Sequence, residues 1–442
     1  MVVDGSCAID QTCRVVGDDG RAARYRDVFA VAEFRVLFAS HLVSIIGDQL
    51  ARVALSVLVF SRTGSPALAA LTYALTLIPD LVGGPLLAGL ADRLPRRRLM
   101  ITCDLSRAGL VAVMALPGVS LWLLGGLVVA VQLAGAPHKA AHTAIMPTIL
   151  AADRFEVAIG LTYATLQTGI LCGFVVGAPL VAWLGPEWAL LLDAATFVVS
   201  VMLLAIGLGP HPPVTTAGTA RATFAGIGSM MGSVWRDRRQ RWLISFGCLA
   251  GCYTVPAGLA VPLAAQIGVG TAAVGLLLAA QPAGAALGST LMTRLVAPGR
   301  RLILLGPFAV ATSAVLLPIG LVPSLGVAVA LCVLSGLLSG HDAIAAATFT
   351  RLVPAERRGQ AYGLALAVVR GTQGLGIAVA GLVAQFSSPS TAIAAFAVLG
   401  TVAATAAATG WRRARIRGTP RADRTNSRMR SVRDLPRSAD IR

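Results

Sequence analysis

Five ionisable residues lie inside long apolar runs of the sequence, where charge is expensive. Asp48 and Arg52 are four positions apart in one run, so on a helix they share a face. Asp80, Asp342 and Arg370 each lie within a separate later run. If these runs cross a membrane, each charge near mid-span costs about 2.5–3.5 kcal/mol on insertion scales. These five residues are therefore the candidates for proton coupling and for contact with a bound substrate.

Proton coupling needs a carboxyl group whose pKa lies near the working pH, and burial and neighbouring cations act on it in opposite directions. Arg52 is expected to hold Asp48 ionised until substrate or helix motion draws the two apart. The alternative is a permanent Asp48–Arg52 bridge that only stiffens its span. Asp80 has no cation within one helical turn, so it is the freer proton carrier on local sequence. Asp342 and Arg370 could form a second pair, but they lie on different predicted helices.

Other polar residues in the apolar runs favour structural roles. Asp104 and Arg107 lie three positions apart near one end of a run, and Asp193 lies near the opposite end of another. His138 and His142 have a spacing of four, but two ligands do not make a metal site, and a place at a helix end is favoured. The seven cysteines show no metal-binding spacing. No metal and no cofactor is predicted.

Enzymatic motifs are missing from the sequence. There is no Gly-x-Ser-x-Gly elbow, no His-Glu-x-x-His zinc helix and no Gly-rich phosphate loop ending in Lys-Ser or Lys-Thr. Lys139 is the only lysine. The protein is therefore not expected to be an enzyme, and the energy for any work must come from an ion gradient.

The elements that must position the buried charges are membrane-spanning helices. The chain of 442 residues is 56% hydrophobic and only 13% charged, which excludes an ordinary soluble protein. A bilayer core needs about 20 apolar residues per helix. Cutting the sequence at charges and Gly/Pro breaks predicts an all-α protein with twelve spans. These are 36–60, 66–91, 99–117, 119–137, 157–184, 187–208, 242–266, 271–293, 302–322, 324–349, 359–385 and 389–411.

The connections between spans predict both topology and domains. Alternate connections carry nearly all the basic residues, Lys139 among them, and the other set holds only Arg62, so both termini are expected in the cytoplasm. The predicted units are an N-terminal tail (1–33), a six-helix bundle (34–209), a cytoplasmic linker (210–241), a second six-helix bundle (242–411) and a disordered basic tail (412–442).

The net charge of +17 does not predict nucleic-acid binding. Residues 412–442 alone hold eleven arginines against three aspartates, and such a block beside a span favours the anionic inner leaflet of the membrane. The two halves also repeat one another. LPRRRLMI corresponds to APGRRLIL, and Pro95 lies 203 residues before Pro298, as Gly160 does before Gly363. A half-length repeat in one orientation is typical of transporters whose two bundles rock about a central site.

One motif resembles the signature of a known family. The segment GGPLLAGLADRLPRRRLM is similar to the Gly-x-x-x-Asp-Arg-x-Gly-Arg-Arg motif of the major facilitator superfamily, with Ala88 and Pro95 in place of its glycines. The resemblance covers about residues 34–411 and is strongest to bacterial drug and metabolite exporters, including macrolide and siderophore exporters. It implies that the motif gates the inner side, with Asp92 as the latch. The matching residues are Asp92, Arg93, Arg96, Arg97 and Arg98. The alternative is that the arginines only hold topology.

A second motif lies in the fifth predicted span. Gly169, Gly173 and Gly177 recur every four residues and precede Pro179, which resembles the exporters' Gly-x-x-x-Gly-Pro motif with Ala178 inserted. A glycine stripe forms a groove that a neighbouring helix can enter, and a proline allows a bend. General helix packing explains this stripe as well as export does.

The resemblance implies that spans one, four, seven and ten line the cavity, which would place Asp48, Arg52 and Asp342 there. The predicted function is secondary transport by alternating access, favouring proton-coupled efflux of a small amphipathic drug, siderophore or metabolite across the cell membrane. A proton-coupled importer of the same fold and a non-transporting membrane sensor or scaffold are the alternatives. The expected partners are a small molecule, protons and membrane lipids, with the protein as a monomer.

Overall fold

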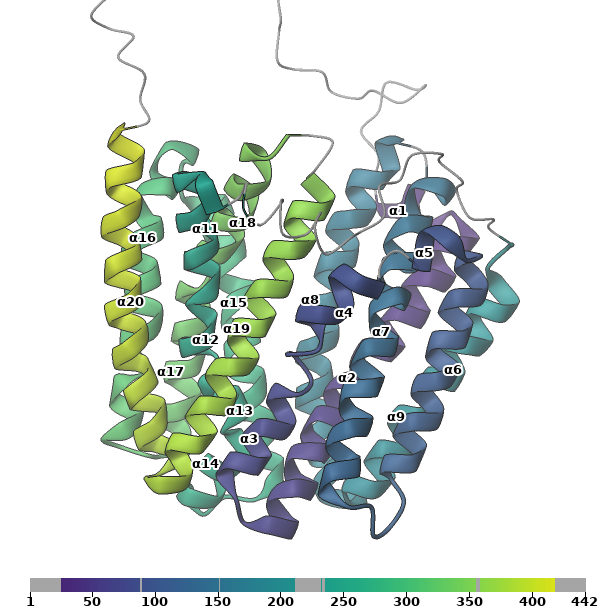
Figure 1. Ribbon diagram of the computed structural model, residues 1–442, viewed down its shortest axis with the longest axis horizontal. Coiled ribbons are helices and arrows are strands. Elements are labelled where there is room, and N and C mark those ends of the chain that lie inside the picture. Colours follow the sequence, from purple (N-terminus) through teal and green to yellow (C-terminus); the bar gives the residue numbers. More distant parts are fainter. Residues whose placement is uncertain are drawn as a thin grey trace, which may run out of the picture.

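The computed structural model describes residues 25–87, 90–150, 152–210, 232, 235–354 and 358–417, and all regular secondary structure in these ranges is helical. Figure 1 shows the helices running roughly parallel in one bundle, as expected for an all-α membrane protein. The first half of the chain contains α1 (Tyr25–Phe29), α2 (Ala32–Thr63), α3 (Pro66–Ala74), α4 (Asp80–Leu87), α5 (Leu90–Arg93), α6 (Arg96–Met114), α7 (Leu121–Ile149), α8 (Ala152–Leu184) and α9 (Pro186–Gly207).

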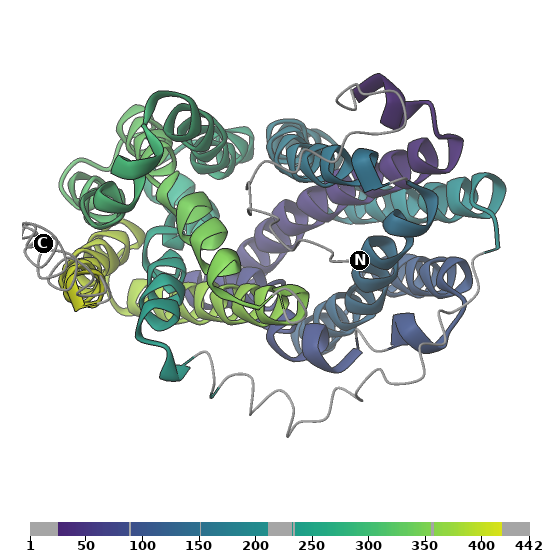
Figure 2. The ribbon, with the colours of Figure 1, turned by 90° about the horizontal axis from the view of Figure 1, so that it is seen from above.

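The second half contains α11 (Arg238–Cys248), α12 (Ala250–Tyr253), α13 (Val255–Gly258), α14 (Ala260–Ile267), α15 (Thr271–Leu295), α16 (Pro298–Ala314), the 3-10 turn η1 (Leu317–Gly320), α17 (Leu325–Leu338), α18 (His341–Leu352), α19 (Arg358–Phe386) and α20 (Pro389–Arg417). Within the first half α2 packs against α8 and α9, and within the second α15 packs against α17 and α16 against α20. Seen from above, the two halves lie side by side (Figure 2).

Local sequence explains where several helices begin and end. The hydroxyls of Ser65 and Ser120 accept hydrogen bonds from backbone amides at the starts of α3 and α7, which satisfies donors that a helix leaves free. Gly64 and Gly268 follow α2 and α14 with φ of 62° and 79°. Glycine adopts this left-handed conformation without the steric strain that a Cβ would cause. A glycine in this conformation is a common end to a helix, as at both of these positions.

Nine helices of the described residues are long and apolar enough to cross a membrane, and one bent pair would raise the number to ten. That pair, Arg238–Gly258 with Ala260–Ile267, bends by 44°. The other two predicted spans depart from simple apolar helices. The second is interrupted by turns between α3 and α4, because Pro79 lacks an amide donor and disfavours helix in the residue before it. The third is α6, which carries arginines at its start and the Asp104–Arg107 pair farther along.

Two helices continue well past the ends of their predicted spans. The fourth span was expected to end at residue 137, yet α7 continues to Ile149 through Pro137 and Pro147. The basic tail was expected to begin at residue 412, yet α20 continues to Arg417. Both extensions show that charged or Pro-containing sequence can stay helical when neighbouring helices support it. The predicted linker lies mostly outside the described residues, as do 1–24 of the N-terminal tail and 418–442 of the C-terminal tail.

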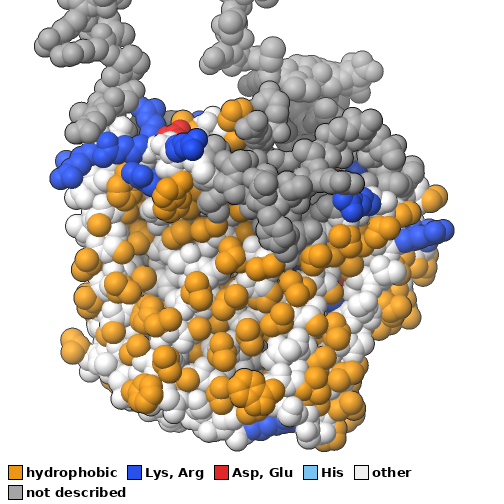
Figure 3. Space-filling view, in the orientation of Figure 1, with side chains coloured by type: hydrophobic (Ala, Val, Ile, Leu, Met, Phe, Trp, Pro, Cys, Tyr) orange, Lys and Arg blue, Asp and Glu red, His pale blue; other side chains and the backbone are white. Residues whose placement is uncertain are grey.

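The outer surface suits a lipid environment. Figure 3 shows hydrophobic side chains spread over the face, with Lys and Arg gathered mainly toward its upper edge. Trp122, Trp183 and Trp188 are exposed at the opposite end of the bundle, where α7 and α9 begin and α8 ends. Tryptophan favours the boundary between lipid and water. We call the arginine-rich end, with Arg93, Arg98 and Arg412, the basic end, and the other the neutral end.

The two halves pack closely from the neutral end to about the middle of the bundle. At the neutral end the Ser65 hydroxyl donates to the Gln385 side-chain oxygen at 2.7 Å. Farther in, a Cβ placed on Gly374 would lie 2.6 Å from Ile78, and one on Gly371 would lie 3.0 Å from Leu81. Nearer the basic end, a Cβ on Gly84 of α4 or Gly363 of α19 would meet nothing within 4 Å.

Candidate functional site

Asp48 of α2 forms its ion pair with α6 rather than within its own helix. Nη2 of Arg107 donates to Oδ1 of Asp48 at 2.7 Å, and the Arg107 side chain is 5% exposed. Arg52 instead donates to the Gln49 side-chain oxygen at 3.0 Å. The predicted Asp48–Arg52 bridge was therefore wrong. Spacing of four residues places two side chains on one face, but Arg107 approaches Asp48 from a neighbouring helix with a better geometry.

The pair continues into a buried network between α6, α7 and α9. Asp104 accepts a hydrogen bond from Ser200 at 2.6 Å and lies 3.0 Å from Nδ1 of His138. Arg107 lies 3.6 Å from Asp104 and stacks on the ring of Phe197. This network links Asp48 to three helices of the first half. Asp104 and Arg107 were predicted to be structural; the structure adds that Arg107 holds the candidate coupling residue.

His138 and His142 do not lie at a helix end, because α7 extends past them. Both are nearly buried, and His142 stacks on His41 of α2 with ring centroids 4.5 Å apart. Across the described ranges, no three His, Cys, Asp or Glu side chains are grouped so that they could hold a metal ion.

Asp80 is bound by two cations, one from each half of the protein. Nζ of Lys139 on α7 lies 3.2 Å from Oδ1 of Asp80, and Nη1 of Arg370 on α19 lies 3.1 Å from Oδ2. The prediction that Asp80 is the freer acid was wrong, since its partners are distant in sequence. Lys139 was also misplaced in a loop, because the fourth span was predicted too short.

The predicted Asp342–Arg370 pair is replaced by other contacts. The Tyr253 hydroxyl donates to Oδ2 of Asp342, and Nε2 of the neighbouring His341 lies 3.4 Å from Oδ1. Tyr253 in turn accepts a hydrogen bond on its backbone oxygen from Gln281. Asp342 is thus held within the second half, while Arg370 reaches across to the first.

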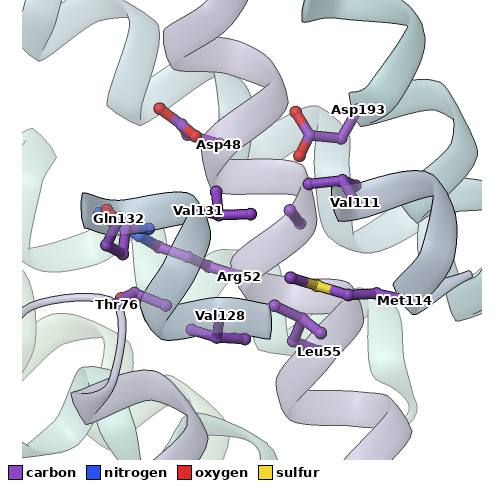
Figure 4. A pocket seen from close by; sticks show the side chains of 11 residues that line it. Asp48, Arg52, Leu55, Thr76, Val111, Met114, Val128, Val131, Gln132 and Asp193 are labelled. Atoms are coloured by element: carbon purple, nitrogen blue, oxygen red, sulfur yellow. The ribbon is translucent and has the colours of Figure 1, made fainter. Parts of the chain in front are cut away.

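A small pocket lies within the first half, beside Asp48 (Figure 4). Its walls are mostly apolar, formed by residues such as Leu55, Val111, Met114, Val128 and Val131. Its polar groups are Asp48, Arg52, Thr76, Gln132 and Asp193. Asp193, for which the sequence favoured a structural role, lines this pocket. Figure 4 shows Arg52 extending toward Gln132 and away from Asp193.

The basic motif contacts its own half. Nη1 of Arg96 donates to the backbone oxygen of Ala144 on α7 at 2.7 Å. Arg97 donates to the oxygens of Leu204 and Ala205 in the last turn of α9, where the helix dipole attracts a cation. Arg93 and Arg98 are exposed. The side chain of Asp92, the predicted latch, lies outside what the structure describes.

The glycine stripe on α8 forms a groove that α2 enters. A Cβ on Gly169 would lie 2.8 Å from Ile45, and one on Gly173 would lie 2.7 Å from Gln49. Gly177 faces the backbone of Leu50 at 3.3 Å. The predicted packing groove is present, and Pro179 lies within α8 just beyond it. The glycines therefore fix the helix that carries Asp48.

This arrangement brings carboxylate and cationic side chains from several helices together in the interior of the helical bundle. Sequence reasoning identified Asp48, Asp80 and Arg370 but missed Arg107, Lys139 and Asp193 as their partners and neighbours. Only the atypical lysine, the only one in the chain, could have drawn attention to α7. An ion pair of this kind holds its acid charged, and separating it leaves a charge uncompensated at low dielectric, which favours proton uptake.

The comparison with known proteins agrees with this architecture. The sequence profile of the Major Facilitator Superfamily matches residues 37–261 and 242–437. The enterobactin exporter EntS of Escherichia coli O1:K1 (APEC) is 27% identical over 294 residues, which is 62% of this chain and 68% of the relative.

Solved transporter structures share the fold. A POT family transporter in complex with 5-aminolevulinic acid has a TM-score of 0.71 at 11% identity, covering 89% of this chain and 98% of that one. The nucleoside transporter NupG has a TM-score of 0.66 at 17% identity, covering 85% of this chain and 99% of that one. The predicted two-bundle membrane fold is confirmed. The matched family also agrees with the prediction of a transporter rather than an enzyme. The chain is a multi-pass membrane transporter that belongs to the Major Facilitator Superfamily.

Proposed function

We propose that this transporter exports a small amphipathic molecule in exchange for protons, by alternating access of one central site to the two sides of the membrane. Export is the favoured direction because the similar curated proteins are enterobactin exporters. Import of a metabolite is the second candidate, because the nucleoside transporter NupG has the same fold.

The observation that carries the proton-coupling proposal is the Asp48–Arg107 pair. Asp48 lines the pocket, and its side chain is 24% exposed, so water or substrate can reach it. Arg107 holds it from another helix at 2.7 Å. A shift of α2 against α6 would separate the two groups and let Asp48 take up a proton. The gradient then supplies the energy, at about 2.3 kcal/mol per proton for each 100 mV.

The exposure of the Lys139 side chain, which is 49% although it lies inside α7, supports a state open toward the basic end. We place the basic end in the cytoplasm, following the positive-inside rule, with both termini there and the protein in the cell membrane. The described arginines of the gating motif contact only their own half, which fits an open inner gate. Closing this end would require the halves to tilt about their contact near Asp80 and Arg370.

Transport in inside-out membrane vesicles tests this proposal. Vesicles containing the full chain are given an inward-acid gradient, and uptake of labelled enterobactin and labelled erythromycin is measured. We expect gradient-dependent uptake of at least one compound, and its loss in Asp48→Asn with substrate binding partly retained. Glu187→Gln is the matched control, because its exposed pair with Arg62 is worth about 0–1 kcal/mol. Full active transport by Asp48→Asn would remove Asp48 from proton coupling, and uptake only in right-side-out vesicles would favour import.

A further inference from the structure

We propose that the transported molecule is an amphipathic anion, whose negative group binds Arg370, Lys139 and Arg52 in competition with Asp80. This inference rests on the proposed transport function and specifies the class of its substrate. We call Arg52, Lys139 and Arg370 the central cation cluster. They come from α2, α7 and α19, so the cluster is shared by the two halves.

The central cation cluster holds more positive charge than its acid can balance. Lys139 and Arg370 both contact Asp80, at 3.2 Å and 3.1 Å, and Arg52 also acts on it electrostatically. The Asp80 carboxylate therefore contacts two cations with a third nearby, and the other acid that acts on Lys139, Asp48, is already paired with Arg107. Uncompensated charge in a membrane interior is costly, so a site with this surplus favours a ligand of opposite sign.

The other acids of the described residues nearby are already engaged. Asp48 is bound by Arg107 at 2.7 Å, and Asp342 accepts the Tyr253 hydroxyl. Asp193 accepts a hydrogen bond from Thr196 within α9. Among the described residues, Arg52 is bound through the neutral side chains of Gln49 and Tyr73, and its Nε is buried without a hydrogen-bond partner. Arg52 thus retains an N–H group that a ligand anion could satisfy.

The cluster is accessible where a cytoplasmic substrate would arrive. The Lys139 side chain is 49% exposed although it lies inside α7. It is at the level where close packing between the halves ends, since Gly371 packs on Leu81 but Gly363 and Gly84 have open space beyond them. A molecule entering from the basic end would therefore meet the cations before the packed region.

The pocket beside Arg52 has walls that suit the apolar part of such a molecule, although Asp48 and Asp193 also line it. Its apolar walls include Leu55, Val128 and Val131, and Arg52 extends into the same space. The pocket has room for only about one water molecule, so an aromatic or aliphatic body would bind there only after the helices around it had moved apart. The anion would take over cations from Asp80 and so loosen the Asp80–Arg370 contact that joins the two halves.

Binding of three probes of equal shape tests the charge preference. The full chain in neutral detergent is dialysed against 1-naphthoate, 1-naphthamide and naphthalen-1-ylmethylammonium. We expect naphthoate to bind at least about ten-fold more tightly than the other two, as for one added charge-assisted hydrogen bond. Arg370→Gln should weaken naphthoate binding by about ten-fold or more, whereas Asp80→Asn should strengthen it by removing the competing carboxylate. Arg412→Gln, which removes an exposed arginine at the basic end, should change nothing.

Arg370→Lys separates a lost charge from a lost fold, because it keeps the positive charge and should retain most of the naphthoate affinity. Equal binding of the three probes, or weaker naphthoate binding in Asp80→Asn, would overturn the anion assignment. These measurements need no gradient. An anion preference in a protein that moves nothing in vesicles would therefore sink the proposed function alone, whereas active transport of a cation that Arg370→Gln leaves unchanged would sink this inference alone.

Discussion

The two halves of this transporter share a helical plan but differ in their ionisable groups. The first half holds Asp48, Arg107, Asp104 and His138 in one connected network. The second half contributes an acid held by a tyrosine, and Arg370, which reaches across to Asp80 in the first half. Among the described residues, the two copies of the repeat therefore keep a common helical plan while the connected network of ion pairs around Asp48 lies in the first.

The difference suggests a division of work. Groups that bind and release protons need partners that can separate, and in the first half these partners lie on different helices. The second half is held by close backbone contacts, such as Gly376 against Gly251 of α12, and would move more nearly as one body. The second half contributes one charged side chain to the site, that of Arg370.

The largest effect on stability is expected from replacing Arg107, the partner of Asp48. Arg107→Gln should lower the free energy of unfolding by about 3–5 kcal/mol, because it leaves both Asp48 and Asp104 without their cation. Arg52→Gln, the matched variant on the predicted but wrong partner, should cost about 1 kcal/mol, since it loses a hydrogen bond to neutral Gln49. Reversible unfolding in mixed micelles measures both. Equal losses would mean that the Asp48–Arg107 contact contributes little.

Glycine substitutions compare how tightly each half is packed. Gly376→Ala should destabilise the protein by about 1–3 kcal/mol, because its Cβ would collide with the backbone of Gly251, which cannot rotate away. Gly173→Ala would place its Cβ 2.7 Å from the Cβ of Gln49 and 3.1 Å from the backbone oxygen of Ile46, a smaller overlap than that of Gly376 with Gly251, so it should cost less. Gly84→Ala, with open space around it, serves as the control in the same unfolding assay. A larger loss for Gly173→Ala would contradict a more rigid second half.

The smallest effect is expected at Asp342. Asp342→Asn keeps an oxygen that can accept the Tyr253 hydroxyl, so stability should change by about 1 kcal/mol or less. Gradient-driven uptake should fall far less than in Asp48→Asn, measured in the same vesicles. Tyr253→Phe provides the complementary change. Loss of transport in Asp342→Asn equal to that in Asp48→Asn would mean that both halves carry protons, and the contrast between them would fail.

The outcome for particular residues shows how far sequence reasoning reached. Apolar runs were enough to locate Asp48 and Asp80 within spans, because an unpaired charge there stands out against its surroundings. Their partners could not be found this way, since Arg107 lies 59 residues from Asp48 and Arg370 lies 290 residues from Asp80. The glycine stripe that begins at Gly169 could be predicted from the sequence, because a groove is a property of one helix face. The helix that packs in this groove could not be predicted.

The sequence by itself determined that the chain is helical, embedded in lipid and built from two related halves, because hydropathy and charge between spans are local properties of the chain. It also placed Asp48 and Asp80 within predicted spans. The tertiary structure alone decided that Asp48 binds Arg107, that Lys139 lies inside a helix, and that Arg370 joins the two halves through Asp80. Ion pairing depends on which side chains reach one another across packed helices, and that depends on how the helices assemble rather than on the spacing within any one of them.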